Sequence, residues 1–340
     1  MNKDLKMIKM IHNPKFINVL FSILTLFVIS VSFAQKRPIT HDPVVAKQGD
    51  TYYLFCTGPG ITRFTSKDLK TWTQADPVFA KSPAWALDVA PGFNGHIWAP
   101  DITLHDGIYY LYYSVSAFGK NTSAIGLVTN TTLNSEDKNY KWEDQGIVIQ
   151  SVPNRDLWNA IDPNLIFDEK GTPYLAFGSF WSGLKMVKLN ANLKEVAKPE
   201  EWTAIASRDR KGDTEEAEAG NAAIEGPFIF KKGDYYYQFN SWDYCCQGEK
   251  STYKLMVGRS KSVTGPYVDK NGVALNNGGG SLVIGGNKNW YGVGHNSVFT
   301  FDSKDYTFMH GYDASDKALP KLIVKEVTWV DGWPTVKPMD

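Results

Sequence analysis

Short apolar runs separated by turn residues recur along the chain in one pattern. Each unit opens with a polar or acidic residue beside a proline, continues with a short apolar run, turns at Gly, Asp or Lys, and ends in an aromatic segment. Two copies are His41-Asp42-Pro43 before residues 50–55 (DTYYLF) and Ala99-Pro100-Asp101 before residues 106–111 (DGIYYL). Short apolar runs bounded by turn residues predict β-strands.

The pattern occurs five times, which predicts an all-β fold, a five-bladed β-propeller. The units open at Asp42, Asp101, Asp162, Glu225 and His295, between 59 and 70 residues apart. Helical periodicity is scarce between these points, and sequence repeats made of several short strands are typical of propellers. Because a blade usually takes about 40–50 residues, the extra length predicts long loops on one face.

The first 34 residues differ from the rest. Four lysines precede an apolar run over residues 17–33, and Ser32-Phe33-Ala34 then offers small residues for cleavage. The alternative is an uncleaved membrane anchor, but a run of about 17 residues is at the short limit for crossing a bilayer. We expect residues 1–34 to be a signal peptide and residues 35–340 to form one catalytic domain. The mature protein is then secreted or periplasmic and free of the membrane.

The balance of charged residues limits the kinds of partner that the protein can bind. Lys+Arg and Asp+Glu number 36 each, and a chain without net positive charge lacks the basic surface that nucleic acid or an anionic membrane requires. We expect no nucleic-acid partner and a neutral polymer as the ligand. Aromatic residues make up 14% of the chain, which favours strands and surfaces on which a ligand can stack.

Three cysteines, Cys56, Cys245 and Cys246, do not make a disulfide framework. For the adjacent pair we expect two buried thiols, with a vicinal disulfide as the alternative. A catalytic cysteine is not expected, because no obvious histidine partner stands nearby.

The acidic residues that open the repeats are the candidate catalytic groups. In a propeller the first strand of each blade lines the axis, so we expect Asp42, Asp162 and Glu225 to converge on one pocket. The alternative is that Asp beside Pro only marks turns, as it often does. Glycoside hydrolysis needs paired carboxylates, because one donates a proton to the leaving oxygen while another activates water or attacks carbon. The three acids therefore predict a glycoside hydrolase.

Several motifs in this order strengthen that interpretation. They are Trp98-Ala99-Pro100-Asp101, 114–127 (SVSAFGKNTSAIGL), 159–164 (NAIDPN), 178–181 (GSFW), 245–267 and 294–297 (GHNS). With them the chain resembles glycoside hydrolase family 43 from about residue 40 to 333, and in particular its endo-α-1,5-L-arabinanases. The resemblance implies a propeller that cleaves internal bonds of arabinan, with inversion of configuration and without an organic cofactor. Arabinan or arabino-oligosaccharides are then the substrate.

Catalytic roles follow from the resemblance by matching motifs. Asp42 in His-Asp-Pro looks like the general base, and Glu225 in Ile-Glu-Gly-Pro looks like the general acid. Asp162 in Ile-Asp-Pro looks like the residue that tunes and orients the acid. Asp101, which opens the second repeat, is expected to be structural or orienting.

Binding roles are implied in the same way. Trp98 and Phe118 match positions that line the sugar-binding cleft, and Asn159 and Ser179 lie in motifs beside it. His295 matches a position that contributes to a central cation site, usually Ca²⁺ with waters. Because Ca²⁺ prefers oxygen ligands, a hydrogen-bonded structural histidine is the alternative.

Three other functions fit parts of the pattern. An exo-acting α-L-arabinofuranosidase or β-xylosidase would have a cleft closed at one end, and a fructan-cleaving propeller would retain configuration. A non-catalytic sugar-binding propeller would tolerate loss of the acid at Glu225, which is present. For an open groove we expect Trp98 and Phe118 on one side and Ser179 and Trp181 on the other. The charged loop 208–220 is expected to be plain surface, with a cover over one end of the cleft as the alternative.

Overall fold

Residues 37–339 are described by the computed structural model. The segment 1–34, assigned above to a signal peptide, lies outside the described residues, and its assignment stays a prediction. Among residues 37–339, no helix is long and apolar enough to cross a membrane.

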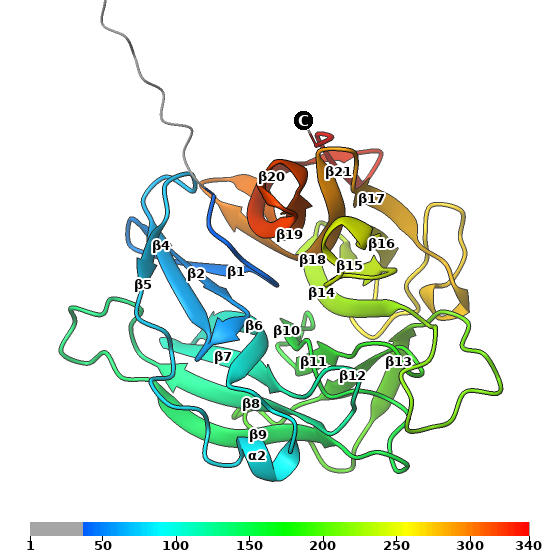
Figure 1. Cartoon of the computed structure of the whole chain (residues 1–340), viewed down its shortest axis with the longest axis horizontal. Helices are drawn as coiled ribbons and strands as arrows, with labels where there is room; N and C mark the ends of the chain where they lie inside the picture. Colours follow the sequence, from blue (N-terminus) through cyan, green and yellow to red (C-terminus); the bar gives the residue numbers. More distant parts are fainter. Residues whose placement is uncertain (1–36, 340) are drawn as a thin grey trace, which may run out of the picture. The chain divides into compact units, whose positions relative to one another are not determined.

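Five antiparallel sheets, one for each repeat, surround a common centre (Figure 1). This arrangement confirms the predicted all-β, five-bladed β-propeller. Each sheet is one blade, and the first strand of each blade lies nearest the centre. The blades follow one another in sequence order, except that the short β3, which lies between two strands of blade 1, pairs with the first strand of blade 2.

The strands of the five blades have the following bounds. Blade 1 contains β1 (Val44–Gln48), β2 (Thr51–Cys56), β4 (Thr62–Ser66) and β5 (Thr73–Ala75). Blade 2 contains β6 (His96–His105), β7 (Ile108–Val115), β8 (Ser123–Asn130) and β9 (Glu143–Ser151), with β3 (Gly58–Pro59) paired to β6. Blade 3 contains β10 (Asn164–Phe167), β11 (Pro173–Phe177), β12 (Leu184–Lys188) and β13 (Trp202–Ala206). Blade 4 contains β14 (Ile224–Lys232), β15 (Tyr235–Trp242), β16 (Lys254–Ser260) and β17 (Ser281–Gly285). Blade 5 contains β18 (Trp290–Phe301), β19 (Lys304–Asp313), β20 (Leu319–Val330) and β21 (Trp333–Val336). Helical turns in the described part of the chain are α2 (Ala86–Val89), η1 (Gly248–Lys250), η2 (Leu275–Asn277) and η3 (Ala314–Asp316).

Two-residue turns join the first and second strands in four blades, and they are the Gly/Asp turns of the sequence repeat. In blade 2 the turn residues Asp106 and Gly107 have φ of +48° and +77°. In blade 5 Asp302 and Ser303 have φ of +50° and +66°. Positive φ at both central residues belongs to the turn whose twist matches that of paired strands, and Asp, Asn and Gly adopt it most readily.

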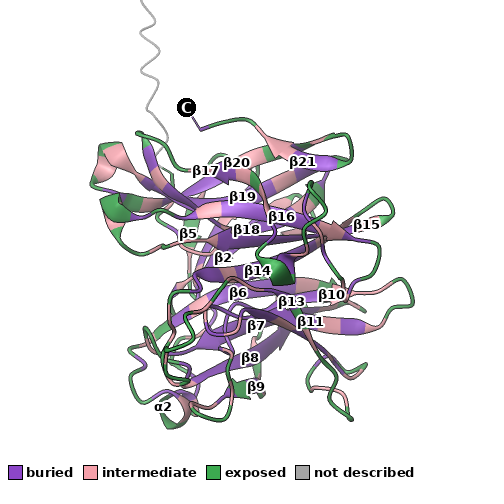
Figure 2. Ribbon diagram, turned by 90° about the vertical axis from the view of Figure 1, so that its right-hand side faces the viewer, coloured by how far each residue is buried: buried purple, intermediate pink, exposed green. Residues whose placement is uncertain are grey.

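Apolar clusters lie between neighbouring blades, because both faces of each sheet are buried. Val44 of β1 packs towards Ile102 and Leu111 of blade 2, whereas the next residue, Val45, packs towards Phe308 of blade 5. A strand covered on both faces carries a continuous apolar run instead of strict alternation. Figure 2 shows the result: burial follows the strands, and exposed residues gather on the loops.

The ring is closed by the beginning of the described chain, which pairs with the last blade. Ile39 forms a β-bridge with Lys321 of β20, and the N–H of Thr40 donates to the carbonyl of Pro320 at 3.2 Å. The hydroxyl of Ser297 in β18 donates to the carbonyl of Pro43 at 2.8 Å. Blade 1 and blade 5 are thereby locked together beside Asp42.

Asp101 has the structural place that the sequence analysis expected. Its side chain is 3% exposed and joins two blades. Oδ2 accepts the N–H of Leu165 at 2.8 Å, and Oδ1 accepts the amide of Asn164 at 3.2 Å. Asn164 in turn accepts the N–H of Ile229 in blade 4. Innermost strands of blades 2, 3 and 4 are linked in this way.

Candidate active site

Contacts between blades bring the predicted catalytic residues together. Nδ1 of His295 in blade 5 lies 3.1 Å from Oδ1 of Asp42, which precedes β1. The same ring lies against Gly226 in blade 4, where an added Cβ would come within 3.0 Å of Nδ1. The N–H of Gly226 donates to Oδ2 of Asp162 at 3.2 Å. Asp42, Asp162 and the segment that carries Glu225 therefore meet around one histidine.

A left-handed residue lies within the innermost strand of each blade or just before it. These residues are Asp42 (φ +53°), Ala99 (+39°), Asp162 (+59°), Gly226 (+60°) and His295 (+48°). For a residue with a side chain this conformation costs about 1–2 kcal/mol, and it persists where surrounding contacts hold it. The turn points the side chains of two acids and one histidine into the same site.

The repeat register corrects one step of the sequence analysis. We expected the three acids at equivalent positions, but Gly226 is the counterpart of Asp42 and Asp162. Glu225 stands one residue earlier, at the position of Trp98 in blade 2. It reaches the shared site because β14 is bulged between Glu225 and Phe228.

Asp42 is held as an ionised carboxylate. The hydroxyl of Thr57, directly after β2, donates to Oδ2 at 2.5 Å, and His295 faces Oδ1. Burial alone would raise the pKa of Asp42. The neighbouring His295, His41 and His310 and the hydrogen bond from Thr57 outweigh burial and lower that pKa to about 2.

The three histidines near Asp42 differ in charge. Burial lowers the pKa of His41 and takes that of His310 well below its usual value. Burial opposes charge on His295 too, but the three surrounding carboxylates raise its pKa above the usual value. The contacts that favour ionised Asp42 therefore also favour the protonated form of His295. His310 contributes a hydrogen bond instead, because its Nδ1 accepts the N–H of Asp42 at 3.2 Å.

The surroundings of Asp162 shift its pKa in the direction opposite to that of Asp42. Burial raises its pKa well above the usual value; His295 opposes this shift, whereas the two neighbouring carboxylates add to it. Its backbone is held by Ser114, whose Oγ accepts the N–H of Asp162 at 3.0 Å. Its carboxyl group accepts the N–H of Gly226 and so fixes the backbone next to Glu225.

Glu225 is held by two hydroxyl groups. Ser179 donates to Oε2 at 2.7 Å, and Tyr253 donates to Oε1 at 2.7 Å. Both donors are buried, with exposed fractions of 5% and 1%. With an ionised carboxylate on one side and a hydroxyl-bound carboxyl on the other, the site can move one proton to and one proton from a substrate.

The residues expected to bind sugar fall into two groups. Phe118 is 82% exposed and Trp98 in β6 is half-buried, so both rings offer surface to a ligand. Asn159 is buried, and its amide donates to the carbonyl of Lys120, which fixes the loop that carries Phe118. Ser179 contacts Glu225, as described above.

Trp181 does not line the site, contrary to the expectation. Its side chain is 2% exposed, and its indole N–H donates to the carbonyl of Glu216 at 3.0 Å. Trp181 thus anchors the loop 208–220 from inside the fold.

Sequence reasoning missed Thr57, Tyr253 and His310. Tyr253 lies inside the 245–267 stretch that carries the family resemblance, so a search of that stretch for buried hydroxyl groups could have found it. Thr57 and His310 lie outside the motifs of the sequence analysis. Their contacts with Asp42 join residues 15 and 268 positions apart.

The adjacent cysteines form a vicinal disulfide, so the expectation of two buried thiols was wrong. Cys245 is half-buried and Cys246 is exposed. The N–H of Cys246 donates to the hydroxyl of Tyr312 at 2.6 Å, and the ring of Tyr312 packs edge-on against His41. The disulfide therefore lies at the edge of the site, whereas Cys56 is a buried free thiol.

A calcium ion at His295 suits these residues only if water supplies most of its ligands. Nδ1 of His295 faces Asp42, which leaves Nε2 as the available ring nitrogen. Among residues 37–339, the ligand atoms of His41, Asp42 and His310 lie within 4.8 Å of one another. Two imidazoles suit a transition metal better than Ca²⁺. The calcium site stays a prediction.

Comparison with known proteins places the chain in a family. The family model for glycosyl hydrolases family 43 matches residues 36–334. Two relatives are the "Extracellular exo-alpha-(1->5)-L-arabinofuranosidase ArbA" of Cellvibrio japonicus and the "Extracellular endo-alpha-(1->5)-L-arabinanase 1" of Bacillus subtilis. The first is 55% identical over 93% of this chain and 91% of its own length. The second is 41% identical over 88% of each chain.

A solved structure supports the same family assignment. The α-L-arabinanase of Cellvibrio cellulosa, solved with arabinohexaose, matches with a TM-score of 0.88 and 56% identity. The match covers 89% of this chain and 96% of that one. The chain belongs to glycosyl hydrolases family 43 and is a glycoside hydrolase.

The hydrogen bond from Tyr253 to Glu225 leads to the first prediction. Tyr253→Phe removes the buried hydroxyl that positions Oε1 of Glu225, a hydrogen bond worth about 0.5–1.5 kcal/mol, and should lower kcat for glycoside hydrolysis by up to about 10-fold. The control is Tyr237→Phe, which removes another buried hydroxyl, bonded to the carbonyl of Gly332 far from the carboxylates. Steady-state kinetics and thermal unfolding of both variants separate the effects. Wild-type kcat in Tyr253→Phe would contradict this assignment.

Proposed function

We propose that this protein is a secreted endo-α-1,5-L-arabinanase that hydrolyses internal bonds of arabinan with inversion of configuration. The proposal is carried by the geometry in which His295 lies 3.1 Å from ionised Asp42 and packs against Gly226, the neighbour of Glu225. Arabinan as the substrate is supported by the relatives, since two bear arabinan-degrading names and a third was solved with arabinohexaose.

In this proposal Asp42 is the general base. Its carboxylate takes a proton from a water molecule, whose oxygen attacks the anomeric carbon from the face opposite the leaving group. The low pKa of Asp42 keeps it ionised at neutral pH, and Thr57 and His295 hold its two oxygens in place. Attack from that face in a single displacement inverts the configuration.

Glu225 is the general acid. It gives its proton to the oxygen of the departing sugar while the glycosidic C–O bond breaks and its electron pair stays on that oxygen. The proton on the carboxyl group points towards the glycosidic oxygen, while the hydroxyl groups of Tyr253 and Ser179 hold the two carboxyl oxygens in place. Asp162 is a positioning residue, because it holds the N–H of Gly226 next to the acid.

We also propose a calcium ion near the axis, held by water and by Nε2 of His295; a metal-bound imidazole is neutral, so the ion would take the place of a proton on His295. When bound, it would add positive charge beside the carboxylates and favour their ionised forms. The proton transfers assigned above to Asp42 and Glu225 do not pass through it.

The endo mode is supported by exposed aromatic rings in different blades. Phe118 comes from blade 2, whereas Tyr244, 42% exposed, comes from blade 4 and lies 6.0 Å from the ring of Phe180. In the view of Figure 1 the loop 208–220 lies at the outside of the ring beside β13, and its backbone does not cross the centre. A polymer that passes the carboxylates in both directions needs contacts of this kind on each side.

An exo-acting α-L-arabinofuranosidase is the second candidate, because the relative with 55% identity carries an exo name. Secretion is supported by the names of both relatives, which are extracellular, and by the predicted signal peptide over residues 1–34.

The acid and base assignments predict different substrate dependence. Glu225→Gln should lose about 10²–10⁴-fold in rate on arabinan. It should lose less on an aryl arabinofuranoside with a good leaving group, which departs without a proton. Asp42→Asn should lose activity on both substrates. Equal losses for Glu225→Gln on the two substrates would remove Glu225 as the acid.

Inversion predicts that no sugar–enzyme bond forms. Methanol added to the reaction should therefore yield no methyl arabinofuranoside, and proton NMR should first detect the anomer opposite to that of the substrate. Appreciable transfer to methanol would assign a retaining mechanism instead.

The endo mode predicts the early products. Linear α-1,5-arabinan should give a ladder of oligosaccharides, and its viscosity should fall well before much reducing sugar appears. Chromatography and viscometry on the same samples measure both quantities. A single short product from the outset would favour the exo candidate.

A further inference from the structure

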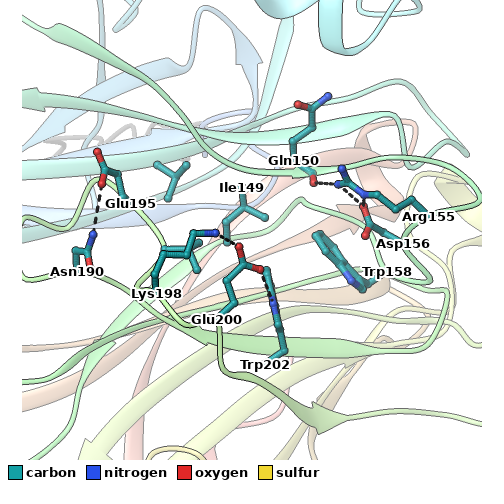
Figure 3. Close-up of a pocket in the computed structure, with 12 residues that line it drawn as sticks. Ile149, Gln150, Arg155, Asp156, Trp158, Asn190, Glu195, Lys198, Glu200 and Trp202 are labelled. Atoms are coloured by element: carbon teal, nitrogen blue, oxygen red, sulfur yellow. Dashed lines mark hydrogen bonds and ion pairs between the residues drawn. The ribbon is translucent and has the colours of Figure 1, made fainter.

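A groove of about 610 Å³ opens at the rim of the propeller, where blades 2 and 3 meet. It lies between β9 and the segments that flank β12 and β13, so it is distinct from the site around His295. Figure 3 shows Trp158 and Trp202 in the groove, with Asn190 and Glu195 at one end and Gln150 and Arg155 at the other.

The two indoles form a rigid platform. Their ring centroids are 5.1 Å apart at an interplanar angle of 29°, and both rings pack edge-on against the fully buried Phe177. The indole N–H of Trp202 donates to Glu200 at 2.9 Å, which fixes the ring. Trp202 is nevertheless 38% exposed. An aromatic ring held in place with one open face suits the apolar face of a sugar and loses little entropy on binding.

The charges in the groove are mostly matched within it. Arg155 pairs with Asp156 at 2.6 Å, and Lys198 pairs with Glu200. Because these ions already have partners, the groove has little attraction for a strongly charged ligand. The same side chains, with Asn190 and Gln150, still offer donors and acceptors to hydroxyl groups. This chemistry suits a neutral, hydroxyl-rich ligand.

The groove is connected to the active site by one segment. Residues 152–162 run from the end of β9 past Trp158 to Asp162. The amide of Asn121 donates to the carbonyls of Asp156 and Trp158 and ties this segment to the loop that carries Phe118. A polymer bound at the rim is therefore held on the same structural unit as the catalytic carboxyl groups.

We propose that this groove binds a second segment of the arabinan chain, remote from the bond that is cut. The proposal rests on the function proposed above, because arabinan is the neutral polymer that the enzyme would meet. The groove then raises affinity for long chains and leaves the cleavage of short ones unchanged.

Trp202→Ala tests this proposal in two assays. In a Glu225→Gln background, affinity gel electrophoresis in linear arabinan should show binding weakened by about threefold to tenfold. With Glu225 intact, kcat/KM for a short arabino-oligosaccharide should stay within about twofold of the parent. Trp202→Phe should recover part of the polymer affinity, and thermal unfolding of each variant reports whether it folds.

Trp329→Ala is the matched control. Trp329 is half-buried and so less exposed than Trp202, but it too stacks on an aromatic ring, that of Phe230, and donates its indole N–H to a carboxylate, that of Asp305. It lies in blade 5, away from the groove. Unchanged polymer binding in Trp202→Ala, or equal losses in the two tryptophan variants, would overturn the proposal. A Trp202→Ala variant that loses activity on short substrates would overturn it as well. A parent that neither binds nor cleaves arabinan would contradict the proposed function, and this inference with it.

Discussion

Each blade is a sheet with two apolar faces, and neither face is covered until both neighbouring blades are in place. Consecutive residues such as Val44 and Val45 point into different inter-blade clusters, so one strand contributes to two cores. The ring must therefore close, and the pairing of Ile39 with Lys321 closes it beside Asp42. The active site depends on this closure, because its acids and its histidine come from four different repeats.

Closure places Asp42, Asp162 and His295 in a small space, and burial favours the neutral form of each. The outcome differs because the contacts differ. Asp42 has His295 and Thr57 beside it and stays ionised, whereas Asp162 has carboxylates as neighbours and a raised pKa. Two residues of the same type thus acquire different chemistry from their surroundings. In the proposed mechanism the ionised Asp42 can act as the base, whereas Asp162 positions the backbone beside the acid Glu225.

The long connections between strands lie where specificity is decided. A relative with an exo name and one with an endo name are 55% and 41% identical to this chain over most of its length. The scaffold alone therefore does not set the mode of attack. The segment 152–162 carries Asn159 and Asp162 towards the axis and Trp158 towards the rim groove. One connection thus carries residues of both the candidate active site and the rim groove.

Local patterns determined much of this protein from the sequence alone. Apolar runs, Asp-Pro openings and two-residue turns are properties of neighbouring residues, and they predicted the strands, the five blades and the acids Asp42, Asp162 and Glu225. The tertiary structure decided the offset of Glu225, the burial of Trp181 and the charge of each histidine. It also placed Tyr253 on Glu225 and His310 on Asp42. These features depend on contacts between residues far apart in the chain, which a local pattern does not encode.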